Sequence, residues 1–204
     1  MITEEELRKN PKPWFTTDSI AFIEEHLDPQ YTVIEFGGGW SSIWWAKRAK
    51  YTLTVEASPG WAERLIKEMI PHPDAMAKWS LKFVPSDWNP NPSNLKQYWK
   101  TNKAYLDETN ISNLTSRYLD IDFTPDVFVI DGSVRCLNID AVDEFLDSKH
   151  EKPKMIVIDN TEVYADYAVD KFNGFKQYDF HEKDTSLIPE WQNGAWCTSV
   201  WIKE

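Results

Sequence analysis

Short apolar runs alternate along this chain with segments that carry apolar residues at helical spacing, and this alternation constrains the fold more than any other feature. Five runs have the length and composition of buried strands, at residues 32–36, 51–55, 79–84, 126–130 and 154–158. Helices are predicted beside them, at residues 18–27, 41–49, 59–70, 138–149 and 161–172. Strands that alternate with helices predict a mainly parallel sheet with helices on both faces.

The last part of the chain departs from this alternation. Residues 175–180 and 195–202 both have strand character, and only the loop 181–194 separates them. A connection without a helix predicts an antiparallel pair. The expected fold class is therefore α/β, a doubly wound, mostly parallel seven-stranded sheet with a C-terminal antiparallel strand pair, which is a Rossmann-like fold.

The 204 residues suffice for one sizeable core, so residues 1–204 are expected to form a single domain. Residues 87–124 interrupt the alternation with prolines and a polar Asn, Thr and Ser run. They are expected to form an insertion over the carboxyl ends of the strands, and to act as a lid together with the loop 181–194.

Composition and charge exclude several classes of protein. The chain has 33 acidic and 22 basic residues, a net charge of −11, and its basic residues are dispersed, so no nucleic-acid partner is expected. No apolar stretch approaches the roughly 20 residues of a membrane helix, and the first residues lack the apolar region of a secretory signal. The expected location is therefore the cytoplasm. Cys136 and Cys197 lack metal-type spacing and are expected to be buried thiols.

A glycine-rich turn joins the first predicted strand to the following helix. It follows Glu35, contains three glycines and leads into serines that can cap the helix: Gly37, Gly38, Gly39, Ser41 and Ser42. Glycines allow a ligand to approach the backbone, and amides at a helix start can bind a carboxylate or phosphate. Glu56 ends the second strand, where a carboxylate can accept hydrogen bonds from ribose hydroxyls. Together these features predict a nucleoside-containing ligand.

Two further positions qualify this prediction. The third glycine of the dinucleotide pattern Gly-x-Gly-x-x-Gly is replaced by Ser42, which weakens the case for NAD. Asp87 follows the third strand and can accept a hydrogen bond from an adenine amine, although a turn residue in this place would look the same.

Over residues 17–202 the chain resembles the class I S-adenosylmethionine-dependent methyltransferases. The resemblance rests on Glu-x-Gly-x-Gly after the first strand, acids after the second and third, Ile-Asp-Gly after the fourth, and the closing antiparallel pair. The segments IEFGGGWSSIWWA, IDGSVR, VIDN and AWCTSVW are similar to bacterial and phage methyltransferase-like proteins. The resemblance implies that Glu35 and the backbone of residues 37–39 hold the methionine end of the cofactor, Glu56 the ribose, and Asp87 with Trp88 the adenine.

Polar residues also follow the fourth and fifth predicted strands. Asp131 ends the fourth strand and Asp159 with Asn160 ends the fifth, and parallel strands deliver such residues to one rim of the sheet. Oxygen ligands of this kind suit Mg²⁺ or Ca²⁺, and the set resembles the metal site of catechol-type O-methyltransferases. The alternative is that these residues only end their strands, with Arg135 paired to one of the aspartates.

The chain lacks the general base of the catechol-type enzymes. Those enzymes place a lysine three residues after the first aspartate, where this chain has Val134. Arg135 stays protonated, so it is expected to clamp a substrate carboxylate or phosphate. His181, just past the sixth predicted strand, is the candidate base, and it completes a predicted catalytic set with Asp131 and Arg135.

The chain contains 11 tryptophans, most of which are expected to pack in the interior. Four of them fall in predicted rim loops, where they can stack on adenine or cover a sugar: Trp40, Trp88, Trp191 and Trp196.

The expected function is methyl transfer from S-adenosylmethionine to an oxygen of a small polar acceptor, such as a sugar, a phenol or a secondary metabolite, with Mg²⁺ as a candidate helper. Two alternatives remain open. One is an NAD-linked oxidoreductase or epimerase, and the other is a nucleoside-binding protein of the same fold without catalysis. The oligomeric state is not determined by the sequence.

Overall fold

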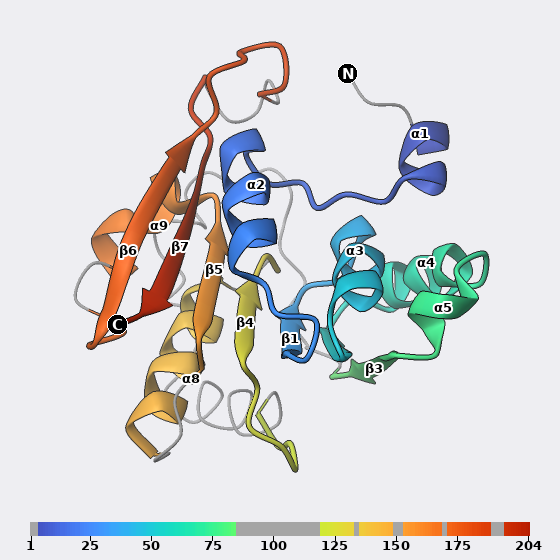
Figure 1. The fold of residues 1–204 in the computed structure, drawn as a ribbon, viewed down its shortest axis with the longest axis horizontal. Helices are drawn as coiled ribbons and strands as arrows, with labels where there is room; N and C mark the ends of the chain where they lie inside the picture. The colour runs from blue at the N-terminus through green and yellow to red at the C-terminus, as the bar shows by residue number, and fades with distance from the viewer. Residues whose placement is uncertain (1–3, 85–118, 133–134, 149–152, 169–170, 189–193) are drawn as a thin grey trace.

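A seven-stranded sheet forms the centre of the computed structural model, which describes residues 4–84, 119–132, 135–148, 153–168, 171–188 and 194–204 (Figure 1). The strand order is β3-β2-β1-β4-β5-β7-β6. The first five strands are parallel, and β7 runs antiparallel to both β5 and β6. The strands are β1 (Thr32–Phe36), β2 (Tyr51–Glu56), β3 (Trp79–Phe83), β4 (Val127–Ile130), β5 (Met155–Asp159), β6 (Phe175–His181) and β7 (Cys197–Lys203). The predicted fold class is confirmed.

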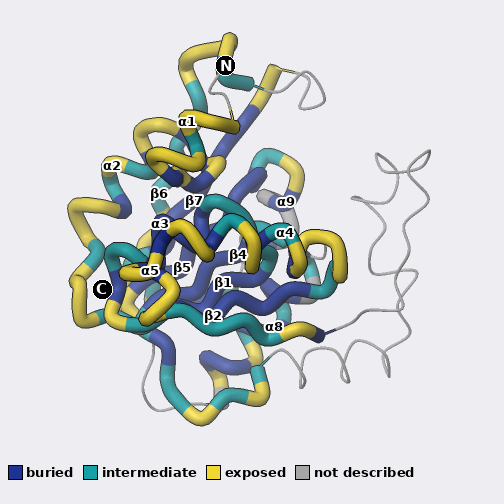
Figure 2. The backbone as a smooth tube through the Cα atoms, turned by 90° about the vertical axis from the view of Figure 1, so that its right-hand side faces the viewer, coloured by how far each residue is buried: buried dark blue, intermediate teal, exposed yellow. Residues whose placement is uncertain are grey.

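Helices cover both faces of the sheet, and alternate residues of each central strand therefore pack on opposite layers. Val33 packs with the tryptophans of α3 and the buried side of α2, whereas Ile34 packs with α8 and α9. Figure 2 shows the central strands buried and the outer turns of the helices exposed. The described helices are α1 (Glu4–Lys9), α2 (Thr17–His26), α3 (Trp40–Arg48), α4 (Pro59–Met69), α5 (Pro73–Met76), α8 (Arg135–Ser148) and α9 (Thr161–Ala168).

The largest differences from the predicted elements lie at helix ends. Helix α8 begins at Arg135, three residues earlier than predicted, which places that side chain in the first turn above the end of β4. The short helices α1 and α5 were not predicted, because six and four residues give too little periodicity to detect. None of the described helices is long and apolar enough to cross a bilayer. Cys197 is buried, Cys136 is half-buried, and neither forms a disulfide.

The predicted lid, residues 87–124, lies outside the described residues up to position 118, and so do Asp87 and Trp88. Residues 189–193 of the loop 181–194, including Trp191, also lie outside them. The roles proposed for these positions stay predictions.

Candidate functional site

The glycine-rich turn after β1 is pressed against the turn after β4. Gly37 has a φ of 90°, and a Cβ added there would lie 2.4 Å from the Gly132 Cα atom. Gly38 is also confined, because its Cβ would meet Leu65 at 2.5 Å. Gly39 is different: among the described residues, a Cβ there would meet only Ser41 Oγ, at 3.8 Å. The backbone of the neighbouring turn therefore requires glycine at position 37, the side chains of Leu65 and Thr54 crowd position 38, and the described residues leave position 39 open in front of α3.

The amides of the three glycines are already used within the protein. They donate to the Val55 carbonyl (2.9 Å), to Glu56 Oε2 (2.9 Å) and to Ser42 Oγ (3.1 Å), in chain order from Gly37. Ser42, the third residue of α3, thus reaches back to the N-cap residue Gly39 and caps the start of the helix. The first amides of a helix lack intrahelical acceptors, and within the described part of the chain the amides of Trp40 and Ser41 at the start of α3 have no other acceptor, so they remain as donors for an anion.

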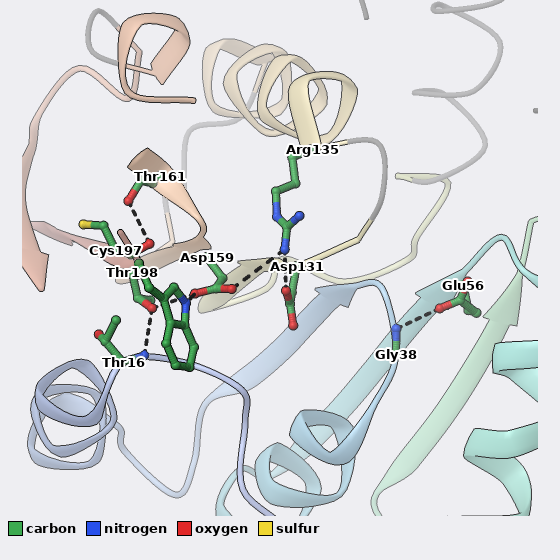
Figure 3. Close-up of polar contacts among 10 residues, drawn as sticks. Thr16, Gly38, Glu56, Asp131, Arg135, Asp159, Thr161, Cys197 and Thr198 are labelled. Atoms are coloured by element: carbon green, nitrogen blue, oxygen red, sulfur yellow. Dashed lines mark hydrogen bonds and ion pairs between the residues drawn. The ribbon is translucent and has the colours of Figure 1, made fainter. Parts of the chain in front are cut away.

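Glu56 fastens this turn to the start of α4. Its carboxylate accepts from the amide of Gly38 at 2.9 Å (Figure 3). It also accepts from the amides of Ala57 (2.8 Å) and Ser58 (2.7 Å), and the residue is 8% exposed. The ribose contact expected of Glu56 stays a prediction. The structure adds that Glu56 holds the loop and α4 together, a role that the position at a strand end did not reveal.

Glu35 lies fully buried on β1. It accepts hydrogen bonds from the hydroxyls of Ser42 and Thr54, the latter at 3.0 Å. Burial raises the pKa of Glu35 to about 8, and the nearby Asp131 adds to the shift, although serine and threonine hydroxyls oppose it. With no accessible surface, Glu35 stabilises the start of α3 from inside the fold. The contact with the methionine end that the resemblance implies stays a prediction.

Asp131 and Asp159 converge as predicted, with Arg135 between them (Figure 3). Arg135 Nη2 lies 2.7 Å from Asp131 Oδ1 and 3.8 Å from Asp159 Oδ2. Burial raises the pKa of both carboxyls, and their mutual repulsion raises that of Asp159 further, while the guanidinium acts in the opposite direction. Arg135 is 8% exposed in its side chain, so it serves this pair rather than a substrate anion.

The predicted metal set does not fit these positions. A guanidinium cation stands between the two carboxylates, where a metal ion would have to bind, and Asp159 Oδ1 is taken by Trp196 Nε1 (3.0 Å) and Thr198 Oγ1 (2.7 Å). Asn160 has a φ of 57°, a conformation in which asparagine is favoured, so the turn into α9 explains it. Within the described ranges, no three His, Cys, Asp or Glu residues form a metal-binding group.

His181 ends β6 on the same edge of the sheet as Asp159. It is exposed and pairs with Cys197, next to the Thr198 that pairs with Asp159. The structure also brings Glu162 to this edge, where it accepts from the Cys197 amide at 2.8 Å and burial raises its pKa. Sequence reasoning missed Glu162, although its position three residues after Asp159, in the first turn of a predicted helix, was visible.

Two tryptophans differ from their predicted roles. Trp196, expected to be available for stacking, is 4% exposed and donates its indole hydrogen to Asp159. Trp40 is half-buried and packs against the small cluster between α3 and α5. Trp14, which was not assigned to the rim, is 62% exposed and lies edge-on to Trp196.

No protein-family model matches the sequence, and no curated protein does. Solved structures do match the fold. An rRNA methylase from Streptococcus thermophilus has 10% identity and a TM-score of 0.56, over 92% of this chain and 95% of that one. The precorrin-6y C5,15-methyltransferase from Geobacter metallireducens GS-15 has 15% identity and a TM-score of 0.54, over 100% of this chain and 90% of that one. The 23S rRNA methyltransferase ErmE has 16% identity and a TM-score of 0.51, over 93% and 70%. The chain therefore has the Rossmann-like fold found in S-adenosylmethionine-dependent methyltransferases.

Proposed function

We propose that the chain binds S-adenosylmethionine and transfers its methyl group to an oxygen of a small polar acceptor. The observation that carries the proposal is the open space at Gly39 in front of α3, beside the carboxylates at the ends of β2 and β4. A helix start with free amides suits the carboxylate of a methionine moiety, and a neighbouring acid suits its ammonium group and a ribose.

The charge of the site supports this cofactor over NAD. Four carboxyl groups surround the turn or lie beside it, and one guanidinium accompanies them: Glu35, Glu56, Asp131 and Asp159, with Arg135. Burial raises the pKa of Glu35 and of Asp159 to about 8, so these two groups carry little charge at neutral pH, and Arg135 balances Asp131. The attraction for a sulfonium and an ammonium, and the repulsion of a pyrophosphate, therefore rest mainly on Glu56 beside the turn. Ser42, in place of the third glycine, is buried and engaged with Gly39, which further disfavours a dinucleotide.

Bound S-adenosylmethionine would supply an electrophilic methyl group. Asp131, 22% exposed in its side chain and fixed by Arg135, would accept a hydrogen bond from the acceptor hydroxyl and orient its oxygen. His181 is exposed at the end of β6, three strands from β4, so the proton that the hydroxyl loses would reach it through water rather than directly. Asp159 is held by Trp196 and Thr198 and would act as a positioning residue that keeps Arg135 in place.

Charge also supports a small acceptor. A net charge of −11 opposes the binding of a polyanion, because nucleic-acid affinity depends on clustered basic residues. The structural neighbours carry the names of rRNA methyltransferases and of a precorrin methyltransferase, so the fold by itself supports neither acceptor class over the other.

The test is transfer of tritiated methyl groups to catechol, to methyl β-glucoside and to total RNA. The proposal predicts methyl transfer to a small acceptor. The rate of transfer should fall by about 100-fold or more in Asp131→Asn and should not change in Asp74→Asn, an exposed control on α5. Transfer only to RNA would contradict the acceptor class. Binding of S-adenosylhomocysteine without transfer to any acceptor would favour a nucleoside-binding protein without catalysis.

A further inference from the structure

Trp14 is the most exposed large apolar side chain in the described part of the molecule. It lies in the extended segment between α1 and α2, in which burial alternates from residue to residue. Pro11, Pro13 and Phe15 are buried, whereas Trp14 is 62% exposed. Successive side chains of an extended segment point to opposite sides, so the buried residues hold the Trp14 ring outward.

The segment is fixed at both ends. Two ion pairs of 3.0 and 2.8 Å join α1 to α4, and at the other end the Thr16 amide donates to Thr198 Oγ1 at 3.0 Å. The segment crosses from the side of α4 to the side of β7 (Figure 1). The exposure of Trp14 is therefore a feature of an anchored segment rather than of a loose terminus.

The side chain of Trp196 lies between Trp14 and Asp159, one of the two aspartates that pair with Arg135. The ring centroid of Trp14 lies 6.5 Å from that of Trp196, with the planes at 89°, and Trp196 donates to Asp159 at 3.0 Å. An edge-to-face contact leaves much of the Trp14 ring uncovered, as its exposure shows. A flat apolar surface thus stands next to the rim where the proposed function places the acceptor.

We propose that Trp14 is the platform on which a hydroxylated ring of the acceptor, a phenol or a pyranose, stacks with its hydroxyl facing the rim at Asp131. The inference rests on the proposed function and names the class of its acceptor. An indole face binds such rings by dispersion and burial of apolar surface.

The test is saturation-transfer NMR with catechol, with methyl β-glucoside and with a ten-residue oligouridylate, each with and without S-adenosylhomocysteine. Trp14→Ala is expected to weaken binding of at least one ring probe by about tenfold, whereas Trp14→Phe keeps a flat ring and retains binding. The matched control is Trp61→Ala, which removes a 50% exposed tryptophan that stacks with Arg64 on α4.

Equal binding of the ring probes to the wild type and to Trp14→Ala would overturn the proposal, and so would the absence of binding of both probes to the wild type. If Trp14→Ala weakens the binding of oligouridylate but of neither ring probe, the proposal is also overturned, and Trp14 is then a contact for nucleic acid. Stabilisation of the folded wild type by S-adenosylhomocysteine tests the proposed function separately. If the ligand stabilises the protein but the ring probes do not depend on Trp14, only the inference about Trp14 fails. If Trp14→Ala keeps that stabilisation and unfolds cooperatively, the loss of ring binding belongs to Trp14 alone.

Discussion

Substitution by alanine is expected to have opposite effects on stability at Gly37 and at Gly60. Gly37→Ala places a methyl group against the Gly132 backbone at a φ of 90°, so we expect a loss of about 2–4 kcal/mol in the free energy of unfolding. Gly60 lies in α4 with open space around its Cβ position, so Gly60→Ala is expected to change stability little or to raise it by up to about 1 kcal/mol. Urea unfolding measures both.

Gly174→Ala separates conformational strain from steric overlap in this comparison. Gly174 has a φ of 86°, and no atom of the described residues lies within 4 Å of its Cβ position. Gly174→Ala should therefore lower the free energy of unfolding by about 1–2 kcal/mol through backbone strain alone. A loss in Gly37→Ala no larger than that in Gly174→Ala would contradict the close packing of the two turns.

Gly39→Ala should affect binding and spare folding. The backbone there is extended, and a Cβ would meet only Ser41 Oγ, at 3.8 Å, so the free energy of unfolding should stay within about 0.5 kcal/mol of the wild type. The added methyl group would stand in front of α3, where the cofactor is proposed to lie. Titration calorimetry should show binding of S-adenosylhomocysteine weakened at least about tenfold. Unchanged affinity would place the ligand elsewhere.

Among the elements, the contact between the glycine turn and α4 depends on one carboxylate. Glu56→Ala leaves the amides of Gly38, Ala57 and Ser58 without their acceptor, so we expect a loss of at least about 2 kcal/mol in stability together with weaker cofactor binding. Glu56→Gln keeps one acceptor oxygen and should lose less. Full stability of Glu56→Ala in thermal unfolding would show that water replaces the carboxylate without cost.

The central strands β1, β2, β4 and β5 were predictable because each is a run buried on both faces, and a sheet covered by helices leaves such runs few alternatives. The positions of Asp131 and Asp159 followed from the same rule, since parallel strands end at one rim. Their partners did not follow, because they come from far along the chain. Trp196 and Thr198 reach Asp159 from β7 and the residues before it, and only the folded sheet brings them within 3.0 Å.

The metal hypothesis found no support for a related reason. Asp131, Asp159 and Asn160 have the right types and positions, but the helix start that places Arg135 between the carboxylates lay three residues earlier than the periodicity suggested. The guanidinium of Arg135 changes which ligands the two carboxylates can bind, and sequence spacing alone does not show where its side chain lies.

For the whole molecule, buried carboxyls predict a pH dependence of stability. The pKa of Glu35 is raised from 4.5 to about 8, so folding favours its protonated form. This contribution is fully present below about pH 4.5 and is lost as the pH rises through about 8. The free energy of unfolding should therefore fall between pH 5 and 9, by at most about 1.4 kcal/mol per pH unit for each proton.

Glu35→Gln isolates this effect. The amide does not titrate, so the variant should show a shallower decline over the same pH range, with the remainder assigned to Asp159, whose pKa is raised in the same direction. Urea unfolding at several pH values provides the measurement. An identical slope in the variant and the wild type would mean that Glu35 is ionised in the folded protein.

Thermal unfolding with S-adenosylhomocysteine, beside NAD and a ligand-free control, tests the central claim most directly. A ligand at 100 times its dissociation constant stabilises the folded state by about 2.7 kcal/mol, which corresponds to a shift on the order of 5 °C in a domain of this size. We expect this shift with S-adenosylhomocysteine and none with NAD. No shift with S-adenosylhomocysteine, or a shift with NAD alone, would contradict the claim.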